Sequence, residues 1–308
     1  MGDRQAKLVV GIASSALFDL TESQAVFESE GVKAYRAFQQ ERLRQPLSPG
    51  IAFPFVRRLL SLNTIPGAHI DVIVMSRNSP ETGLRVMHSI AHHRLPITRA
   101  VFREGRSSYA FMPAFGMSLF LSANADDVKQ AVADGLPAGR VLRGGVGEDD
   151  GDELRVAFDF DGVLADDSSE SVYAEHGLET YTDHERQHAD EALPPGPLAP
   201  FLESLNQIQE LENELAEAGE YSPRLRVSLV TARSAPAHER AINSLAQWGL
   251  RVDDAFFLGG LEKAPIINEL SPHLFFDDQR RHLDQKDLTA PAVHIPFGVR
   301  NRPMKPAD

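Results

Sequence analysis

The sequence contains no cysteine among its 308 residues. Disulfide bonds are therefore excluded, and so are metal sites built from thiolates, such as the common structural zinc sites. A chain without disulfides suits a reducing compartment, so we expect the protein to reside in the cytoplasm.

Positive charge is also scarce, because 31 Lys and Arg residues stand against 44 Asp and Glu residues and give a formal net charge of −13. Binding of nucleic acid along a broad basic face is not expected, since such binding depends on neutralising phosphates. No apolar run approaches the roughly 20 residues of a membrane span. The apolar stretch near the N-terminus contains Asp19 and lacks a small-residue cleavage site, so we interpret it as a strand and not as a signal peptide. We expect neither a nucleic-acid partner nor a membrane partner.

The apolar residues fall into short strand-like runs that alternate with helical patterns. These runs are KLVVGIA, IDVIVMS, MSLFLS, LRVAFDF, LRVSLVT and PHLFFDD. Such alternation predicts α/β architecture with parallel sheets. At this length, two domains are expected.

A change of composition near the middle of the chain suggests where the two domains meet. Residues 137–153, PAGRVLRGGVGEDDGDE, are rich in glycine and acidic residues and show no period, which predicts a linker. The domains are then residues 1–136 and 154–308. Within the second, we expect a helical cap at about residues 168–224.

The two halves repeat each other. A shift of 155 positions lays residues 71–105 over residues 226–260 without a gap, and a shift of 146 aligns the segments before them. Matched pairs include Ser79 with Ser234, Phe102 with Phe257, Gly31 with Gly177 and Tyr35 with Tyr181. Constant offsets over two long blocks indicate an internal duplication.

A helix is expected after a repeated strand in each half. In the first half, Ser79 and Pro80 have the residue types that begin helices. In the second half, Ser234 is the expected N-cap, Pro236 a tolerated first-turn residue, and Gly249 the end of the helix.

A run of carboxylates after the strand at residues 154–158 is the main chemical signal. Asp159 and Asp161 alternate with Phe160, so they point to one side at the carboxyl end of a parallel strand, where open α/β sheets bind ligands. Further segments contribute Thr231, Lys263, Asp277 and Asp278. Four segments would thus deliver a hydroxyl, an amine and several carboxylates to one edge of a sheet.

This many carboxylates require a counter-ion. Two carboxylates about 4 Å apart repel by roughly 4 kcal/mol at an effective dielectric constant near 20. Mg²⁺ prefers oxygen ligands from carboxylates, water and phosphate, so we expect a magnesium site. Asp159 would then attack a phosphoryl group and form an aspartyl phosphate, while Thr231 and Lys263 hold the non-bridging oxygens. Asp161 is placed to protonate the leaving alcohol and then to activate water.

As a set, these residues resemble the four motifs of the haloacid dehalogenase superfamily phosphatases. The matching segments are DFDGV from Asp159, VTA from Val230, Lys263, and FFDD ending at Asp278. Longer stretches, including RVAFDFDGVLADDSSES, LVTARSAPAHERAINSLAQWGL and, in the first half, LFLSANADDVKQAV, are similar to the cytosolic type I 5'-nucleotidases. The resemblance covers nearly the whole chain.

The resemblance implies two haloacid-dehalogenase-like halves, each with a Rossmann-type parallel sheet, and hydrolysis of nucleoside 5'-monophosphates. It also implies a Mg²⁺ cofactor, a cytoplasmic location and a homo-oligomer. In this interpretation the nucleophile is Asp159, the acid/base is Asp161, the phosphate binders are Thr231, Ala232 and Lys263, and the metal ligands are Asp159, Asp161, Asp277 and Asp278. The spacing leaves open which of the last two binds the metal directly. We favour Asp278, with Asp277 as its support.

The first half lacks the charged residues of this set. Under the two shifts, the catalytic positions fall on Ala13, Ser15, Ser76, Ser108, Ser122 and Ala123. The first half is therefore predicted to be a catalytically inactive copy. Arg77 and Asn78, beside the lost site, are its candidates for contacting a nucleotide, and an ordinary role at the start of a helix is the alternative.

One motif suggests a different metal. The segment HERQH, residues 184–188, matches the HExxH zinc pattern, but it lies in a very polar stretch that soon meets Pro194 and Pro195. A cap helix with His184 near the substrate entrance is the better interpretation.

Two other functions remain open at this point. One is a phosphatase of the same superfamily that acts on sugar phosphates or other small phosphomonoesters. The other is a nucleotide-binding regulator without turnover.

Overall fold

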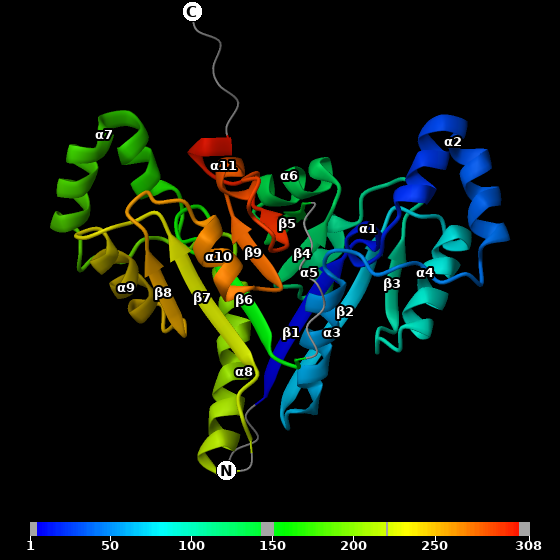
Figure 1. Ribbon diagram of the computed structural model, residues 1–308, viewed down its shortest axis with the longest axis horizontal. Coiled ribbons are helices and arrows are strands. Elements are labelled where there is room, and N and C mark those ends of the chain that lie inside the picture. Colours follow the sequence, from blue (N-terminus) through cyan, green and yellow to red (C-terminus); the bar gives the residue numbers. More distant parts are fainter. Residues whose placement is uncertain (1–4, 143–150, 220, 302–308) are drawn as a thin grey trace, which may run out of the picture.

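The computed structural model describes residues 5–142, 151–219 and 221–301, and its centre is a single sheet of ten strands. The strand order is β3-β2-β1-β4-β5-β10-β9-β6-β7-β8 (Figure 1). Neighbouring strands are parallel except β5 and β10, which pair antiparallel at the centre of the sheet. The predicted α/β fold with a mostly parallel sheet is confirmed.

The strands divide evenly between the two halves of the chain. The first half contributes β1 (Ala6–Ile12), β2 (Ala68–Ser76), β3 (Arg99–Phe102), β4 (Leu119–Ser122) and β5 (Ala138–Val141). The second contributes β6 (Leu154–Phe158), β7 (Leu225–Thr231), β8 (Asp254–Phe257), β9 (Leu274–Asp277) and β10 (Ala292–His294). The six apolar runs of the sequence correspond to β1, β2, β4, β6, β7 and β9.

Helices connect the strands. Those of the first half are α1 (Ser14–Leu17), α2 (Thr21–Glu41), α3 (Phe53–Ser61), α4 (Pro80–His92), α5 (Met112–Phe115) and α6 (Ala125–Ala133). Those of the second half are α7 (Ser168–Gln187), α8 (Ala199–Glu217), α9 (His238–Gln247), α10 (Ala264–Leu270) and α11 (Arg280–Leu283). In the part of the chain that the structure describes, no helix is both long and apolar enough to cross a membrane.

The arrangement of the first half recurs in the second. From the outer edge inwards, the strands run β3-β2-β1-β4-β5 in one half and β8-β7-β6-β9-β10 in the other. Helices α2 and α7 are bent at Gly31 and Gly177, whose φ angles of 80° and 79° lie in the left-handed region that favours glycine. Figure 1 shows these two bent helices on the same side of the sheet, at opposite ends.

Hydrogen bonds also recur at the positions matched by the sequence shifts. Leu47 N donates to Ser89 Oγ as Leu193 N does to Ser244 Oγ, and Arg85 Nε donates to the carbonyl of Gln45 as Arg240 Nε does to that of Glu191. The repeat therefore extends from the strand order to individual side-chain contacts.

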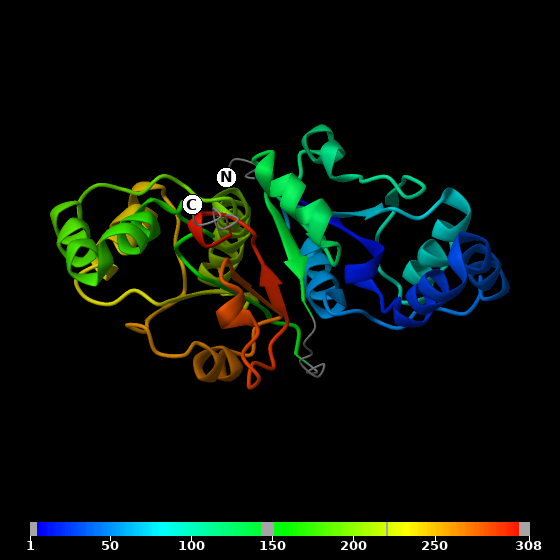
Figure 2. The same cartoon turned by 90° about the horizontal axis from the view of Figure 1, so that it is seen from above.

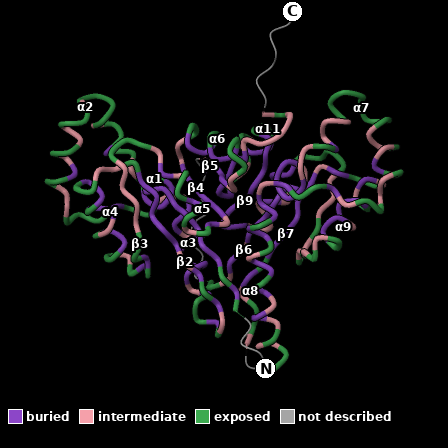
Figure 3. The backbone as a smooth tube through the Cα atoms, turned by 180° about the vertical axis from the view of Figure 1, so that it is seen from behind, coloured by how far each residue is buried: buried purple, intermediate pink, exposed green. Residues whose placement is uncertain are grey.

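The two halves share one hydrophobic core. Phe201 of α8 lies 6.0 Å from Phe158, 5.9 Å from Phe276 and 6.5 Å from Phe55 of the first half, measured between ring centroids. Figure 2 shows the two halves side by side, with β5 and β10 between them. In Figure 3 the buried backbone runs through the sheet, while much of α2 and α7 is exposed. The halves are thus packed as one body.

The predicted cap range, residues 168–224, contains two helices with different positions. Helix α7 lies at the end of the sheet, and few of its residues are buried. Helix α8 instead packs against β1 and β7, with Phe201, Leu205 and Ile208 fully buried. An apolar face of this kind makes α8 part of the core.

Two local predictions were wrong. Part of the expected linker, Ala138–Val141, is strand β5, because it completes pairing with β4 and β10; residues 143–150 lie outside the described residues. Helix α9 begins at His238 and not after Ser234, because Ala235 precedes a proline and is disfavoured in helical conformation. The Ser79 N-cap of α4 is confirmed, since its side chain accepts a hydrogen bond from Thr82 N.

Candidate active site

The carboxylates of the second half gather where β6, β7 and β9 end. Strand β6 lies between β9 and β7 and is parallel to both, so the three carboxyl ends meet. Asp159 follows β6 directly, and its backbone N–H donates to the carbonyl of Phe276 at 2.8 Å. Thr231 ends β7, Asp277 ends β9, and both are buried.

Lys263, at the start of α10, joins two of these carboxylates. Its Nζ lies 2.7 Å from Asp159 Oδ2 and 2.7 Å from Asp277 Oδ2, and the side chain is buried. Asp277 also contacts His282 Nδ1 at 2.9 Å and accepts from Gln279 N at 2.7 Å. Both carboxylate oxygens of Asp277 therefore have partners. The carboxylate holds Lys263 and the turn after β9 in place.

Burial affects the cluster unequally. Burial raises the pKa of Asp159 to about 8, and the charge of Asp277 adds to this, although Lys263 opposes it. Burial acts the same way on Asp277, but Lys263 and His282 outweigh it and lower that pKa to about 2. Burial, with the charges of Asp277 and Asp159, holds the pKa of Asp278 well above its usual range. The protein alone thus leaves two carboxyl groups without enough positive charge around them.

The cluster contains a carboxylate oxygen without a hydrogen-bond partner, and this fits a site for a divalent cation. Asp278 Oδ1 is buried and has no hydrogen-bond partner among the described residues. Gly162 lies against this carboxylate, since a Cβ there would be 2.8 Å from Asp278 Cγ. Asp159, Asp277 and His282 also offer ligand atoms within 4.8 Å of one another. Because Lys263 already bridges Asp159 and Asp277, the unpartnered oxygen of Asp278 is the clearest sign of an additional cation.

Asp161 has a different partner. Arg233 holds both of its carboxylate oxygens, with Nη2 at 2.7 Å from Oδ1 and Nε at 2.8 Å from Oδ2. The guanidinium of Arg233 also pairs with Glu185 of α7, which is fully buried. Arg233 thus connects α7 to a carboxylate of the site.

Glu185 is the glutamate of the HERQH motif. It accepts hydrogen bonds from Arg240 Nη1 and Ser169 Oγ, both at 2.8 Å. Although burial tends to raise its pKa, the charge of Arg233 outweighs this and lowers it. A glutamate enclosed by two arginines does not serve as a zinc-site base, so these contacts argue against the zinc interpretation, and the cap helix stays a prediction.

The ion-pair network of Arg233, Glu185 and Arg240 was missed by sequence reasoning. Arg233 follows Thr231 by two positions in the VTAR segment, and this proximity to the motif was the available signal. His184 lies beside the network, with Nδ1 3.3 Å from Glu185 Oε1, and its ring stacks on that of His188 at 4.3 Å.

Two of the three predicted phosphate binders lie where β7 ends, Thr231 as its last residue and Ala232 in the turn that follows. Thr231 Oγ1 accepts from Arg233 N at 3.2 Å, and the carbonyl of Ala232 accepts from Gly260 N at 3.1 Å. These bonds set the turn that brings Arg233 toward Asp161.

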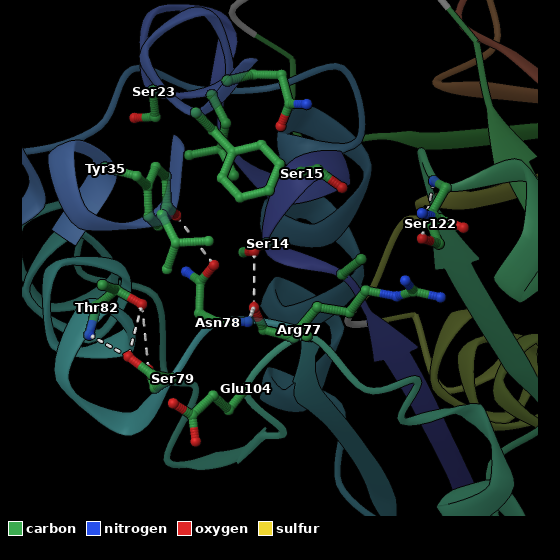
Figure 4. Close-up of a pocket in the computed structure, with 18 of the residues that line it drawn as sticks. Ser14, Ser15, Ser23, Tyr35, Arg77, Asn78, Ser79, Thr82, Glu104 and Ser122 are labelled. Atoms are coloured by element: carbon green, nitrogen blue, oxygen red, sulfur yellow. Dashed lines mark hydrogen bonds between the residues drawn. The ribbon is translucent and has the colours of Figure 1, made fainter. Parts of the chain in front are cut away.

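Arg77 and Asn78 lie apart from this cluster. They line a pocket of about 620 Å³ in the first half, together with Ser15 and Ser76 (Figure 4). Arg77 pairs with Asp127 at 2.5 Å, and Asn78 accepts from the Tyr35 hydroxyl at 3.1 Å. The pocket lies at the carboxyl ends of β1, β2 and β4, the place that corresponds to the Asp159 cluster.

Comparison with known proteins identifies similar sequences. The sequence model of the 5'-nucleotidase family matches residues 1–302. A human protein, cytosolic 5'-nucleotidase 1B, is 32% identical over 286 residues, which cover 90% of this chain and 47% of that protein. The chain thus spans about half the length of this curated relative. Among solved structures, a chain of the Pnkp1/Rnl/Hen1 complex matches at 14% identity, covering 96% of this chain and 98% of that chain, with a TM-score of 0.29, too low to indicate a shared fold.

Proposed function

Because the chain belongs to the 5'-nucleotidase family, we propose that it hydrolyses nucleoside 5'-monophosphates to nucleoside and inorganic phosphate. The observation that carries this proposal is the buried Asp159 at the carboxyl end of β6, in contact with Lys263 and in the same cluster as Asp277. A phosphatase needs a nucleophile, fixed positive charge and a place for a cation, and this cluster supplies candidates for each.

In the proposed reaction, a carboxylate oxygen of Asp159 attacks phosphorus, and the bond from phosphorus to the 5'-oxygen breaks. The product is an aspartyl phosphate, which water then hydrolyses. Lys263 lies 2.7 Å from the attacking carboxylate and would share its charge with the phosphoryl oxygens. Thr231 and the backbone of Ala232 would complete the phosphate site.

Asp161 is the proposed acid and base. It would donate a proton to the departing 5'-oxygen and later accept one from the attacking water. Both oxygens of Asp161 are held by Arg233, which fixes the orientation of the group. Because Arg233 also binds Glu185, the position of α7 is coupled to that of Asp161.

We propose Mg²⁺ as the cofactor, held chiefly by Asp159 and Asp278, with Asp161 and Asp277 as further members of the ligand set. The unpartnered Oδ1 of Asp278 supports it as a direct ligand, while the bonds of Asp277 to Lys263 and His282 support a positioning role. When bound, the cation would neutralise part of the carboxylate charge and stabilise charge on the phosphoryl group.

We further propose that the two halves arose by internal duplication and that the first is catalytically inactive. The repeated strand order and the glycine bends at Gly31 and Gly177 support the duplication. The cap would be formed by α7, with His184 facing the substrate.

The human relative's name also suggests a cytoplasmic location. A homo-oligomer remains a prediction, which light scattering can test.

A substrate panel tests the function. Release of phosphate from purine and pyrimidine monophosphates and from sugar phosphates should be measured with and without Mg²⁺. We expect the nucleotides to be preferred, Mg²⁺ to be required, and Asp159→Asn to lower turnover by at least about a thousandfold.

Asp166→Asn is the matched control, because it makes the same change in the same acidic run but at a carboxylate that accepts hydrogen bonds from Ser168. This variant should keep most of the activity. Preference for sugar phosphates would favour the general phosphatase, and nucleotide binding without phosphate release would favour the regulator. Appreciable turnover by Asp159→Asn would contradict the assigned nucleophile.

A further inference from the structure

A pocket lies in the first half where β1, β2 and β4 end, and the residues at the positions of Asp159, Asp161 and Asp277 are uncharged there. Its volume of about 620 Å³ lies within the range of roughly 300–1,000 Å³ that is typical of small-molecule sites. At its base, Ala13, Ser15 and Ser122 take the positions of Asp159, Asp161 and Asp277. A cavity persists where a duplicated active site would be.

Serine hydroxyls line this base, and Ser15 and Ser122 stand at two of the carboxylate positions. Ser14 Oγ and Ser76 Oγ lie 3.0 Å apart, and Figure 4 shows Ser14 and Asn78 facing the same space as Tyr35. Hydroxyls both donate and accept hydrogen bonds, so they suit the hydroxyls and ring nitrogens of a neutral ligand.

The positive charges that line the pocket are already neutralised. Arg77 pairs with Asp127 at 2.5 Å, and Arg36 pairs with Glu104 at 2.6 Å. Among the described lining residues, these are the two arginines, and there is no lysine. An anionic ligand such as a phosphate would therefore have to break an ion pair, whereas an uncharged ligand would not.

An aromatic corner closes one side of the pocket. The rings of Phe27 and Tyr35 lie 5.9 Å apart at 85°, and Phe27 is 43% exposed. The matched pair in α7, Tyr173 and Tyr181, has almost the same geometry, with 5.8 Å and 82°. An exposed ring beside a polar base offers a surface on which a planar heterocycle can pack.

We propose that this pocket binds an uncharged nucleoside, with the base against Phe27 and the sugar hydroxyls toward the serines. The choice of a nucleoside, which is the organic product of the proposed reaction, rests on the proposed function. The neutral chemistry and the aromatic corner of the pocket are observed independently of the proposed function.

Met75 provides a probe of this pocket. Met75 lines the pocket, and the sequence has no methionine between residues 118 and 303, which include the Asp159 cluster. The full chain carrying Asp159→Asn and ¹³C-methyl methionine should be titrated with adenosine and with cytidine while methyl spectra are recorded. We expect the Met75 signal to shift saturably with at least one nucleoside, while Met87, which is not part of the pocket lining, stays in place.

Paired variants locate the ligand. Phe27→Ala should weaken the apparent affinity by about tenfold, because stacking on an aromatic ring is lost. The matched change at the equivalent position of α7, Tyr173→Ala, should leave the Met75 titration unchanged. Both side chains are substantially exposed, so neither truncation opens a cavity in the core.

The outcomes separate this proposal from the proposed function. No Met75 shift with either nucleoside, an unchanged affinity in Phe27→Ala, or a shift with inorganic phosphate in place of nucleoside would overturn the proposal. Phosphate release by the unmodified chain is measured separately, so a failure of hydrolysis and a failure of nucleoside binding are distinguishable.

Discussion

Replacing the proposed nucleophile should make the metal-free protein more resistant to unfolding at neutral pH. Burial raises the pKa of Asp159 from an ordinary value of 3.8 to about 8, so the folded state binds this proton more tightly than the unfolded state does. The stabilisation from this proton is complete below pH 4 and is lost as the pH rises toward 8. The pKa of Asp278 is raised as well and acts with the same sign.

The size of this loss of stability follows from the interval between the two pKa values of Asp159, about 3.8 in the unfolded state and about 8 in the folded state. Each pH unit between the two pKa values is worth about 1.4 kcal/mol, so the free energy of unfolding should fall by about 3 kcal/mol from Asp159 alone between pH 5.5 and 7.5. His294, whose pKa is lowered by burial, acts in the opposite direction and only near its ordinary value of 6.5. The net change with rising pH should remain a loss of stability.

Urea denaturation in the presence of a chelator, at pH 5.5 and 7.5, measures this difference. Asp159→Asn should make the loss smaller and leave the part that comes from Asp278, whereas Glu203→Gln, which changes an exposed carboxylate on α8, should leave the whole loss intact. Added Mg²⁺ should restore stability to the unmodified protein at pH 7.5. If chelated wild-type protein were equally stable at both pH values, or if Asp159→Asn lost as much stability as wild type, the electrostatic reasoning would be refuted.

Three further predictions concern single contacts of the site. Lys263→Met should lower the free energy of unfolding by about 3–5 kcal/mol in urea denaturation, because two buried carboxylates lose their shared partner. Arg233→Lys should lower kcat by about tenfold in steady-state assays while the thermal transition persists, because an ammonium cannot hold both oxygens of a carboxylate; an unchanged kcat would contradict the positioning role. Gly177→Ala should cost about 1–2 kcal/mol and Gly162→Ala more than that, since both positions have left-handed φ angles but only the Cβ at Gly162 would crowd a neighbour. Only Gly162→Ala should raise the Mg²⁺ concentration needed for half-maximal turnover, because only there does the new Cβ meet Asp278.

The cluster around Asp159 could be anticipated from the sequence because its carboxylates lie at strand ends. The order of strands in a parallel sheet determines which ends meet, and the motifs placed Asp159, Lys263 and Asp277 on adjacent segments. The structure brings these three side chains into contact. Their roles in catalysis remain proposals.

The partners of Asp161 could not be anticipated in the same way. Glu185 lies in a local pattern typical of a zinc site, and only the three-dimensional structure shows that Arg233 and Arg240 enclose it. Ion pairs between distant segments leave no periodic signal in the sequence. The position of α8 could not be predicted from the sequence either. Its amphipathic pattern shows that one face is covered but does not show which element covers it.

The antiparallel pairing of β5 with β10 joins the halves as two subunits of a symmetric dimer would join through their sheet edges. In a true homodimer every mutation appears on both sides of the interface, so an active site cannot be lost from one subunit alone. In a single chain the two sides can change independently. The first half has Ala13, Ser15 and Ser122 at the positions that correspond to Asp159, Asp161 and Asp277, while its edge strand β5 is paired. The second half made by itself would expose the edge of β10 and the face of Phe201 that meets Phe55, which are features of aggregation-prone proteins. If the first half is catalytically inactive, as we propose, it still covers the edge of the half that we propose performs the reaction.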